Sequence, residues 1–142
     1  MNIRTANLHD VAAIARLSTE LGYPCDPASM LVRLRKVTSQ NNHLLLVAQN
    51  DDGEICGWLH AFGADYLESG FRVEIAGLVV ARAAQRSGIG SRLVKEAELW
   101  GRKIGAEFAN VRSNINREAS HPFYEKLGYK PRKTQKVYGK RL

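Results

Sequence analysis

The 142-residue sequence has few cysteines and no long apolar run. The two cysteines, Cys25 and Cys56, lack metal-ligand spacing, and Cys56 lies in a strand-like stretch, so we expect free thiols. No segment approaches the roughly 20 apolar residues that a membrane-spanning helix needs. The N-terminal MNIRTANLHD lacks the apolar stretch of a signal peptide. These absences predict a cytoplasmic protein with no membrane partner.

Acidic residues are outnumbered, with 14 Asp and Glu against 21 Lys and Arg, and the formal net charge is +7. Such an excess suits nucleic acid, or equally a cofactor that carries several phosphates. An RNA-binding module would also need aromatic side chains among its charges, and only Tyr138 lies in the basic tail. We therefore do not expect a nucleic-acid partner, and a basic RNA-binding module stays a remote alternative.

The length predicts a single domain over residues 1–142. The composition, 44% hydrophobic and 25% charged, is ordinary for a globular protein, and the sequence contains no internal repeat. Apolar spacing, helix caps and turn residues predict strands at 2–6, 43–49, 54–62, 75–80, 107–112 and 133–138. They predict helices at about 11–21, 27–37 and 91–104. They also predict a last helix, capped by Asn116 and ended by Gly128, that either kinks at Pro122 or effectively starts near Ser120.

The stretch from Glu74 to Arg92, EIAGLVVARAAQRSGIGSR, organises the rest of the chain. An apolar strand runs from Ile75 to Val80, a glycine-containing loop follows from Gln85 to Gly90, and a helical pattern begins at once. Glycines let a backbone come close to a ligand, and the free amides at a helix start bind anions. The loop therefore predicts a phosphate site.

The pattern Gln85-x-x-Gly88-x-Gly90 after an apolar strand resembles the pyrophosphate loop of the GNAT N-acetyltransferase superfamily. Glu74 precedes Gln85 by eleven residues, the offset at which histone acetyltransferases of this superfamily carry their general base. The segment from Asn116 to Tyr129, NREASHPFYEKLGY, resembles a later signature of the superfamily. The resemblance implies a mixed α/β GNAT-like fold, with a mostly antiparallel sheet of six or seven strands and about four helices. It also implies an acetyl-CoA-dependent acyltransferase that acetylates an amine.

The resemblance assigns roles to particular residues. Glu74 would be the general base, and strand alternation would place it on the face of Leu78 and Val80, in an apolar setting. Tyr124 would protonate the departing CoA thiolate. Arg86 replaces a usual glycine, so we expect its φ to stay below zero. The residues expected to bind the cofactor are Leu78, Val79, Val80, Gln85, Arg86, Ser87, Gly88, Ile89, Gly90, Ser91 and Asn116.

No Cys or Ser nucleophile with a flanking base is visible, so we expect direct attack in a ternary complex, with no metal. The expected acceptor is a primary amine of a small molecule, and the alternative is a protein N-terminus or lysine. The sequence also leaves open whether the chain forms a homodimer, whether Asn114 or Asn116 contacts CoA, and whether either serves only a cap or turn. His60 is open as a proton shuttle or a structural residue. Glu74 is open as a base that acts directly or through water, or as a strand-end carboxylate in solvent or in a salt bridge. Tyr124 is open as the acid or as a tyrosine packed under the sheet.

Overall fold

The computed structural model of the protein describes residues 1–113 and 118–142. These residues form two compact units, Met1–Val111 and Arg112–Leu142, each built from its own elements. Among the described residues, no helix has both the length and the apolar character to cross a membrane.

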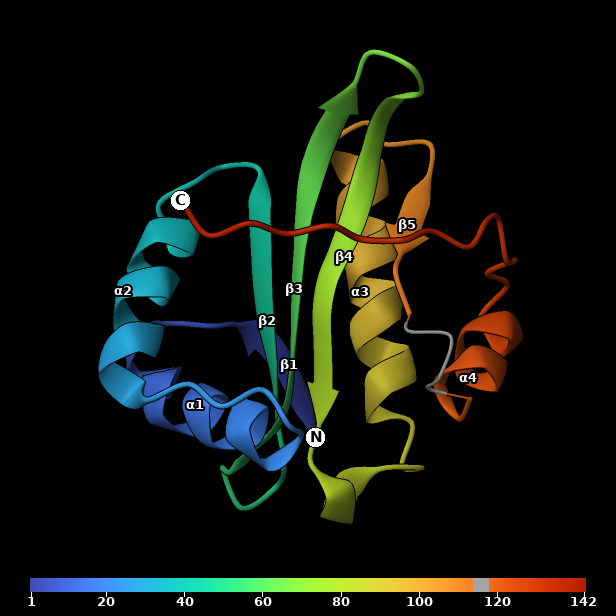
Figure 1. The fold of residues 1–142 in the computed structure, drawn as a ribbon. Helices are drawn as coiled ribbons and strands as arrows, with labels where there is room; N and C mark the ends of the chain where they lie inside the picture. Colours follow the sequence, from blue (N-terminus) through green and yellow to red (C-terminus); the bar gives the residue numbers. More distant parts are fainter. Residues whose placement is uncertain (114–117) are drawn as a thin grey trace. The chain divides into compact units, whose positions relative to one another are not determined.

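The first unit contains one sheet with the strand order β1-β2-β3-β4-β5 (Figure 1). The first four strands are antiparallel to their neighbours, and β5 is parallel to β4. The predicted mixed α/β fold is confirmed, although the described residues form five strands rather than six or seven. The strands are β1 (Asn2–Thr5), β2 (His43–Gln49), β3 (Ile55–Tyr66), β4 (Gly70–Val80) and β5 (Ala109–Val111).

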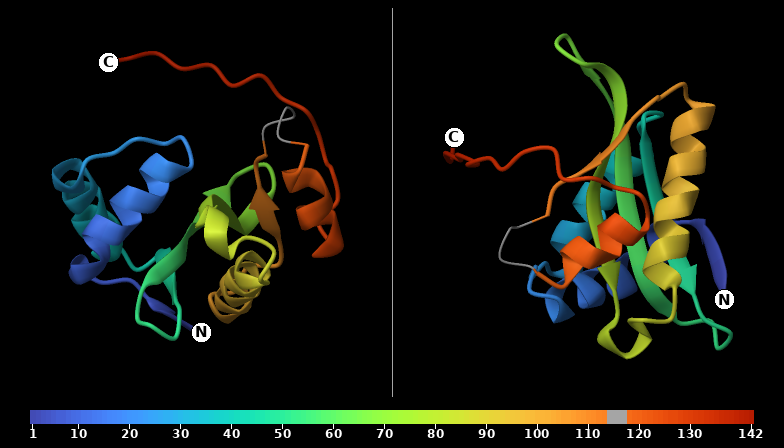
Figure 2. Two further views of the ribbon diagram at one scale, coloured as in Figure 1. Left: turned by 90° about the horizontal axis from the view of Figure 1, so that it is seen from below. Right: turned by 90° about the vertical axis from the view of Figure 1, so that its right-hand side faces the viewer.

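Helices cover both faces of this sheet (Figures 1 and 2). One face carries α1 (Val11–Glu20), which follows the short turn η1 (Leu8–Asp10), and α2 (Pro27–Thr38). The other face carries α3 (Ile89–Lys103). Asp26 caps α2 by accepting a hydrogen bond from the Ser29 amide at 2.8 Å, as predicted.

The core lies on the two faces of the sheet. On the α1/α2 face the fully buried side chains include Ile14, Leu17 and Val47. On the α3 face Leu93 and Val94 are fully buried. Each such side chain stabilises the fold by about 1.5–3 kcal/mol relative to its exposure to water. The apolar helix stripes predicted from the sequence therefore pack as expected.

β4 contains a bulge that the sequence analysis did not predict. β3 pairs Phe62 with Glu74 and His60 with Gly77, so Ala76 has no partner on β3. A bulge inserts one residue and shifts the alternation of side chains beyond it. Glu74 therefore lies on the α1/α2 face, whereas Leu78 and Val80 lie on the α3 face, and the prediction of a shared face was wrong.

The predicted parallel crossover from β4 through α3 to β5 is confirmed. β5 pairs with β4 only from Val73 to Ile75. Among the described strands, none pairs with this edge of β4 from Ala76 to Val80. This open edge leads directly to the predicted phosphate loop.

The second unit contains α4 (Ser120–Lys126), which begins at Ser120, the second of the two outcomes expected around Pro122; the predicted cap Asn116 lies outside the described residues. Pro122 is the third residue of this helix, where its missing amide hydrogen is not needed for an intrahelical bond. The predicted strand at 133–138 was wrong, because residues 129–142 contain no regular secondary structure. The alternating pattern is not enough to form a strand, since strand backbone groups need a neighbour to pair with.

Candidate active site

The predicted phosphate loop connects β4 to α3 through the short turn η2 (Arg82–Ala84). Gln85 has extended backbone, and its Nε2 donates to the Val80 carbonyl at 3.1 Å. Ser87 Oγ hydrogen-bonds the Ala84 carbonyl. The Gln85 bond fixes the loop to the end of β4, and the Ser87 bond closes a turn within the connection itself.

Two residues of the loop adopt left-handed backbone conformations. Gly88 has φ +85° and Arg86 has φ +67°. The expectation that Arg86 avoids positive φ was therefore wrong. A positive φ costs a non-glycine residue about 1–2 kcal/mol. Alternation of left- and right-handed residues turns successive amides towards one side, and this makes a concavity that suits an anion.

The start of α3 supplies the remaining amides. Gly88 is the N-cap and has no side chain to cap the helix, and the first intrahelical bond runs from Arg92 N to Gly88 O at 3.1 Å. The amides of Ile89, Gly90 and Ser91 precede that bond, so they have no partner within the helix. With the positive end of the helix dipole they form the kind of site that binds phosphate.

The predicted pantetheine-binding residues lie at the end of β4. Val79 is buried, and Leu78 and Val80 are half-buried. An extended ligand can add to an open strand edge through backbone hydrogen bonds. The edge and the loop together bring all the predicted cofactor residues from Leu78 to Ser91 onto one continuous segment.

Glu74 is buried, with 3% of its surface exposed, and it is surrounded by polar groups. Its Oε1 accepts hydrogen bonds from Arg72 Nε at 2.7 Å and from Tyr66 Oη at 3.1 Å. Its Oε2 accepts one from Asn110 Nδ2 at 3.0 Å. The expected apolar setting was wrong, because the bulge turns Glu74 away from Leu78 and Val80.

These contacts decide what Glu74 is able to do. A carboxylate offers about four lone-pair directions, and three are used, so one on Oε2 is left for a water or an amine. The Arg72 guanidinium also lies 3.9 Å from the centre of the Tyr66 ring. Burial alone would lower the pKa of Arg72, but its bonds to Tyr66 and Glu74 outweigh burial and raise it. The Arg72 guanidinium therefore stays charged beside Glu74.

Sequence analysis missed Arg72, Tyr66 and Asn110. Arg72 had a usable signal, since it lies two residues before Glu74 and so on the same strand face. Asn110 gave no such signal in the sequence. It lies 36 positions from Glu74, and only the pairing of β4 with β5 brings the two side chains together. Long-range pairing of this kind is not encoded in local periodicity.

Tyr124 lies in α4, in the second unit, with its ring 5.0 Å from Phe123 and 6.0 Å from Tyr129. Its role as a proton donor stays a prediction. Asn114 and Asn116 lie outside the described residues. Within the described ranges there is no group of three or more His, Cys, Asp or Glu arranged to hold a metal ion.

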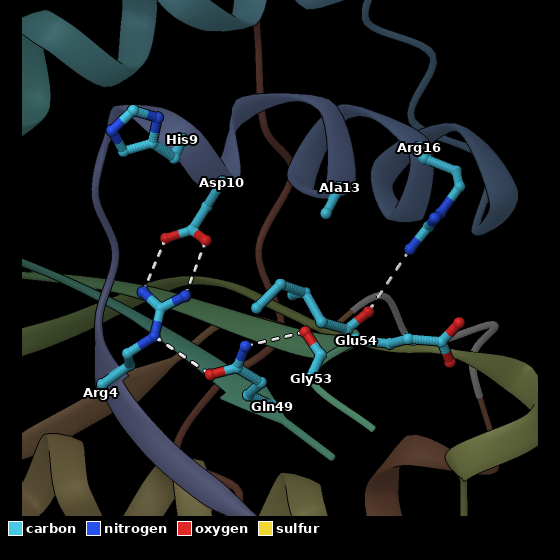
Figure 3. A pocket seen from close by; sticks show the side chains of 9 residues that line it. Arg4, His9, Asp10, Ala13, Arg16, Gln49, Gly53 and Glu54 are labelled. Atoms are coloured by element: carbon cyan, nitrogen blue, oxygen red, sulfur yellow. Dashed lines mark hydrogen bonds and ion pairs between the residues drawn. The ribbon is translucent and has the colours of Figure 1, made fainter. Parts of the chain in front are cut away.

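A pocket of about 270 Å³ lies between α1 and the turn that joins β2 to β3, and neither Glu74 nor the predicted phosphate loop lines it (Figure 3). Asp10, 5% exposed, accepts two bonds of 2.8 Å from the Arg4 guanidinium, and the Asn7 amide donates to it at 2.9 Å. These bonds lower the pKa of Asp10, with the bond from Arg4 the largest cause. Gln49 connects Arg4 to the Gly53 carbonyl. The polar groups of the pocket thus satisfy one another, which indicates a structural role.

Comparisons with known proteins agree with this geometry. The model of the Acetyltransferase (GNAT) family matches residues 9–129. The uncharacterized N-acetyltransferase YhdJ of Bacillus subtilis (strain 168) is 27% identical over 116 residues, which cover 80% of either chain.

Two further proteins resemble the chain. The aminoalkylphosphonate N-acetyltransferase of Salmonella typhimurium (strain LT2) is 35% identical over 91 residues, which cover 63% of this chain and 58% of that relative. The crystal structure of the aminoglycoside N-acetyltransferase AAC(6')-Iy in complex with CoA is 19% identical, with a TM-score of 0.89 over 99% and 95% of the two chains. It shows that the fold is shared.

The family match spans the open β4 edge, the amide-rich loop and the buried carboxylate described above. This chain therefore belongs to the GNAT family of acetyltransferases and is an acetyl-CoA-dependent N-acetyltransferase.

Proposed function

We propose that this enzyme transfers an acetyl group from acetyl-CoA to a primary amine of a small molecule by direct attack in a ternary complex. The observation that carries the proposal is the loop from Gln85 to Ser91, whose left-handed residues and uncapped helix start present amides to an anion. The CoA diphosphate is the group that this loop would hold.

The cofactor would continue from the loop along β4. Its pantetheine arm would pair with the open edge at Leu78 to Val80, as an added strand does. Ala76, which has no partner on β3, lies two residues further along this edge. The thioester would therefore lie beside the bulge, where backbone amides stabilise the charge that develops on its oxygen.

Glu74 is the proposed base. The acceptor arrives as an ammonium and must lose a proton before its nitrogen attacks the thioester carbon. The free lone-pair direction on Glu74 Oε2 is available for that proton, and burial of the carboxylate favours transfer through one water. The C–N bond then forms, the C–S bond breaks, and Tyr124 is the proposed donor of a proton to the thiolate.

The proposal of a small acceptor rests on the named relatives. The 35% identical relative is named for an aminoalkylphosphonate, and the crystal structure that shares the fold is named for an aminoglycoside. Acetylation of a protein N-terminus or lysine would use the same loop and the same base, so the acceptor is what separates the two functions.

Mass spectrometry of mixed acceptors tests the proposal. Enzyme and acetyl-CoA are incubated with aminoalkylphosphonates, aminoglycosides and simple diamines, and in parallel with peptides that carry a free N-terminus and a lysine. We expect a mass gain of one acetyl group on a small amine. Acetylation of the peptides alone would contradict the small-molecule proposal and leave the acetyltransferase assignment intact.

A further inference from the structure

Two histidines form a hydrogen-bonded pair on the sheet face that carries Glu74. His43 Nδ1 lies 2.9 Å from His60 Nε2, and the two rings are stacked, with centroids 5.1 Å apart and planes 17° apart. Phe62 packs against both rings. A single hydrogen fits between the two nitrogens, so one ring donates and the other accepts.

The outer nitrogens of the pair are open. Among the described residues, no hydrogen bond reaches His60 Nδ1 or His43 Nε2. Both rings are half-buried. A purely structural histidine usually has its second nitrogen satisfied by a neighbour, whereas a proton relay needs both ends open.

The pair begins next to the candidate site. Phe62 is paired with Glu74 across the β3–β4 ladder, and His60 is paired with Gly77, the residue after the bulge. His60 is therefore the diagonal neighbour of Glu74 on the same sheet face, and the backbones of such neighbours are about 7–8 Å apart, within reach of long side chains. In the relay proposed below, one water lies between the Glu74 carboxylate and His60 Nδ1.

We propose that His60 and His43 form a relay that carries the proton released by acetylation from Glu74 to solvent. The relay rests on the proposed function and adds to it the path by which the base is regenerated. His60 and His43 are relay residues, because neither needs to touch the acceptor or the cofactor.

The proton count requires such an exit. An ammonium acceptor loses two protons when its nitrogen becomes an amide, and the departing CoA sulfur takes up only one. The second proton passes from Glu74 through a water to His60 Nδ1. The hydrogen on His60 Nε2 then moves to His43 Nδ1, and the hydrogen on His43 Nε2 moves to bulk water. No other reactant is needed.

The charge state of the pair agrees with this path. Burial and the neighbouring His43 lower the pKa of His60 to about 4. Burial also lowers the pKa of His43. Both rings are therefore neutral at neutral pH, and a concerted transfer along the pair needs neither ring to become charged.

Single-turnover acetylation tests the relay, with 2-aminoethylphosphonate as the probe amine and a dilute buffer. His43→Phe and His60→Phe keep a stacked ring and remove the nitrogens. We expect each to slow acetyl transfer about 10-fold, below the roughly 10²–10⁴-fold of a direct general base. Added imidazole should restore most of the rate of His43→Phe, because His43 is the end of the relay that the proposal assigns to solvent and its ring is only half-buried.

The control is His9→Phe, which removes an exposed histidine of η1 and should leave both the rate and the response to imidazole unchanged. If His43→Phe does not fold, His43→Gln serves in its place. An unchanged rate, or a slow rate that imidazole does not restore, overturns the relay. Wild-type enzyme that binds CoA but does not acetylate the probe instead counts against the proposed acceptor.

Discussion

Two buried carboxylates of this enzyme are bound by arginine, and they make a matched pair for testing Glu74. Glu74 is bound by Arg72 near the open edge of β4, and Asp10 is bound by Arg4 in the remote pocket. Both side chains are almost fully buried. Neutralising either one leaves a guanidinium without its partner charge, buried in the case of Arg72 and half-buried in the case of Arg4, so both changes should lower stability.

Glu74→Gln should therefore differ from Asp10→Asn only in catalysis. We expect kcat to fall about 10²-fold for Glu74→Gln, most at pH values below the pKa of the acceptor amine, where the ammonium must be deprotonated. Calorimetry should show nearly unchanged CoA affinity. Asp10→Asn should lose about 2 kcal/mol of unfolding free energy and keep its kcat. Equal kcat values for the two variants would remove Glu74 from the base role.

The histidine pair predicts how stability varies with pH. The folded pKa of His60 is about 4, below the ordinary value of 6.5, so the unfolded chain binds the proton more tightly. Stability is full above about pH 6.5 and falls as the pH drops towards 4. The full shift corresponds to roughly 3 kcal/mol, and partial exposure reduces this to about 1–2 kcal/mol.

Urea unfolding at several pH values measures this effect. His60→Phe should reduce the dependence between pH 6.5 and 4.5, and what remains is the contribution of His43, whose pKa burial also lowers. Asp10, whose pKa is lowered by its bond to Arg4, contributes stability that is lost only below about pH 4, so it does not obscure the window. A slope as large in His60→Phe as in the unaltered enzyme would contradict the contribution of His60.

At the scale of elements, two substitutions of Arg86 in the loop before α3 distinguish the effect of backbone strain from the effect of charge. Arg86 carries both a positive φ and a cation at the phosphate site. Arg86→Ala removes the cation and keeps the strain, whereas Arg86→Gly removes both. We expect the two variants to lose CoA affinity equally, about 3- to 10-fold.

Their stabilities should differ. The free energy of unfolding should be about 0.5–1 kcal/mol higher for Arg86→Gly than for Arg86→Ala, since glycine adopts positive φ without strain. Chemical denaturation gives the difference directly. If the alanine variant were the more stable one, the left-handed conformation of Arg86 would be contradicted.

Local sequence patterns were sufficient to predict most helices and strands, but not the surroundings of Glu74, which depend on how the strands pair. The Asp26 cap, the α3 stripe and the β4–α3–β5 crossover are confirmed, because each depends on spacing within one stretch. The bulge at Ala76 was missed since a run that is apolar at nearly every position shows no alternation to break. Without the bulge, the face of Glu74 and its polar partners could not be predicted.

At the scale of the whole molecule, the chain divides into a sheet-containing unit and a C-terminal unit that carries Tyr124. The family match extends over both, to residue 129. The prediction of a strand at 133–138 was wrong and the Asn110 contact was missed for the same reason. Both depend on partners distant in sequence, which local patterns do not show.

Tyr124→Phe tests the part of the mechanism assigned to the C-terminal unit. The change removes only the hydroxyl and keeps the ring that packs with Phe123 and Tyr129. Thiolates leave without much help, so we expect kcat to fall about 10²-fold, the low end for a general acid, with CoA affinity kept. An unchanged kcat together with a lower melting temperature would make Tyr124 structural.

CoA binding at the two ends of α3 tests the account most directly. Gly88 begins this helix at φ +85° and Gly105 follows it at φ +93°, and a Cβ at either position would meet no atom within 4 Å. Valine at either one should therefore impose a similar strain, about 1–2 kcal/mol. Only Gly88 belongs to the proposed phosphate loop.

Isothermal titration of CoA into Gly88→Val and Gly105→Val is the decisive measurement. The account predicts that Gly88→Val loses CoA affinity by at least about 10²-fold, while Gly105→Val binds CoA as the unaltered enzyme does. Equal affinities for the two variants would contradict the assignment of the loop from Gln85 to Ser91 as the CoA diphosphate site.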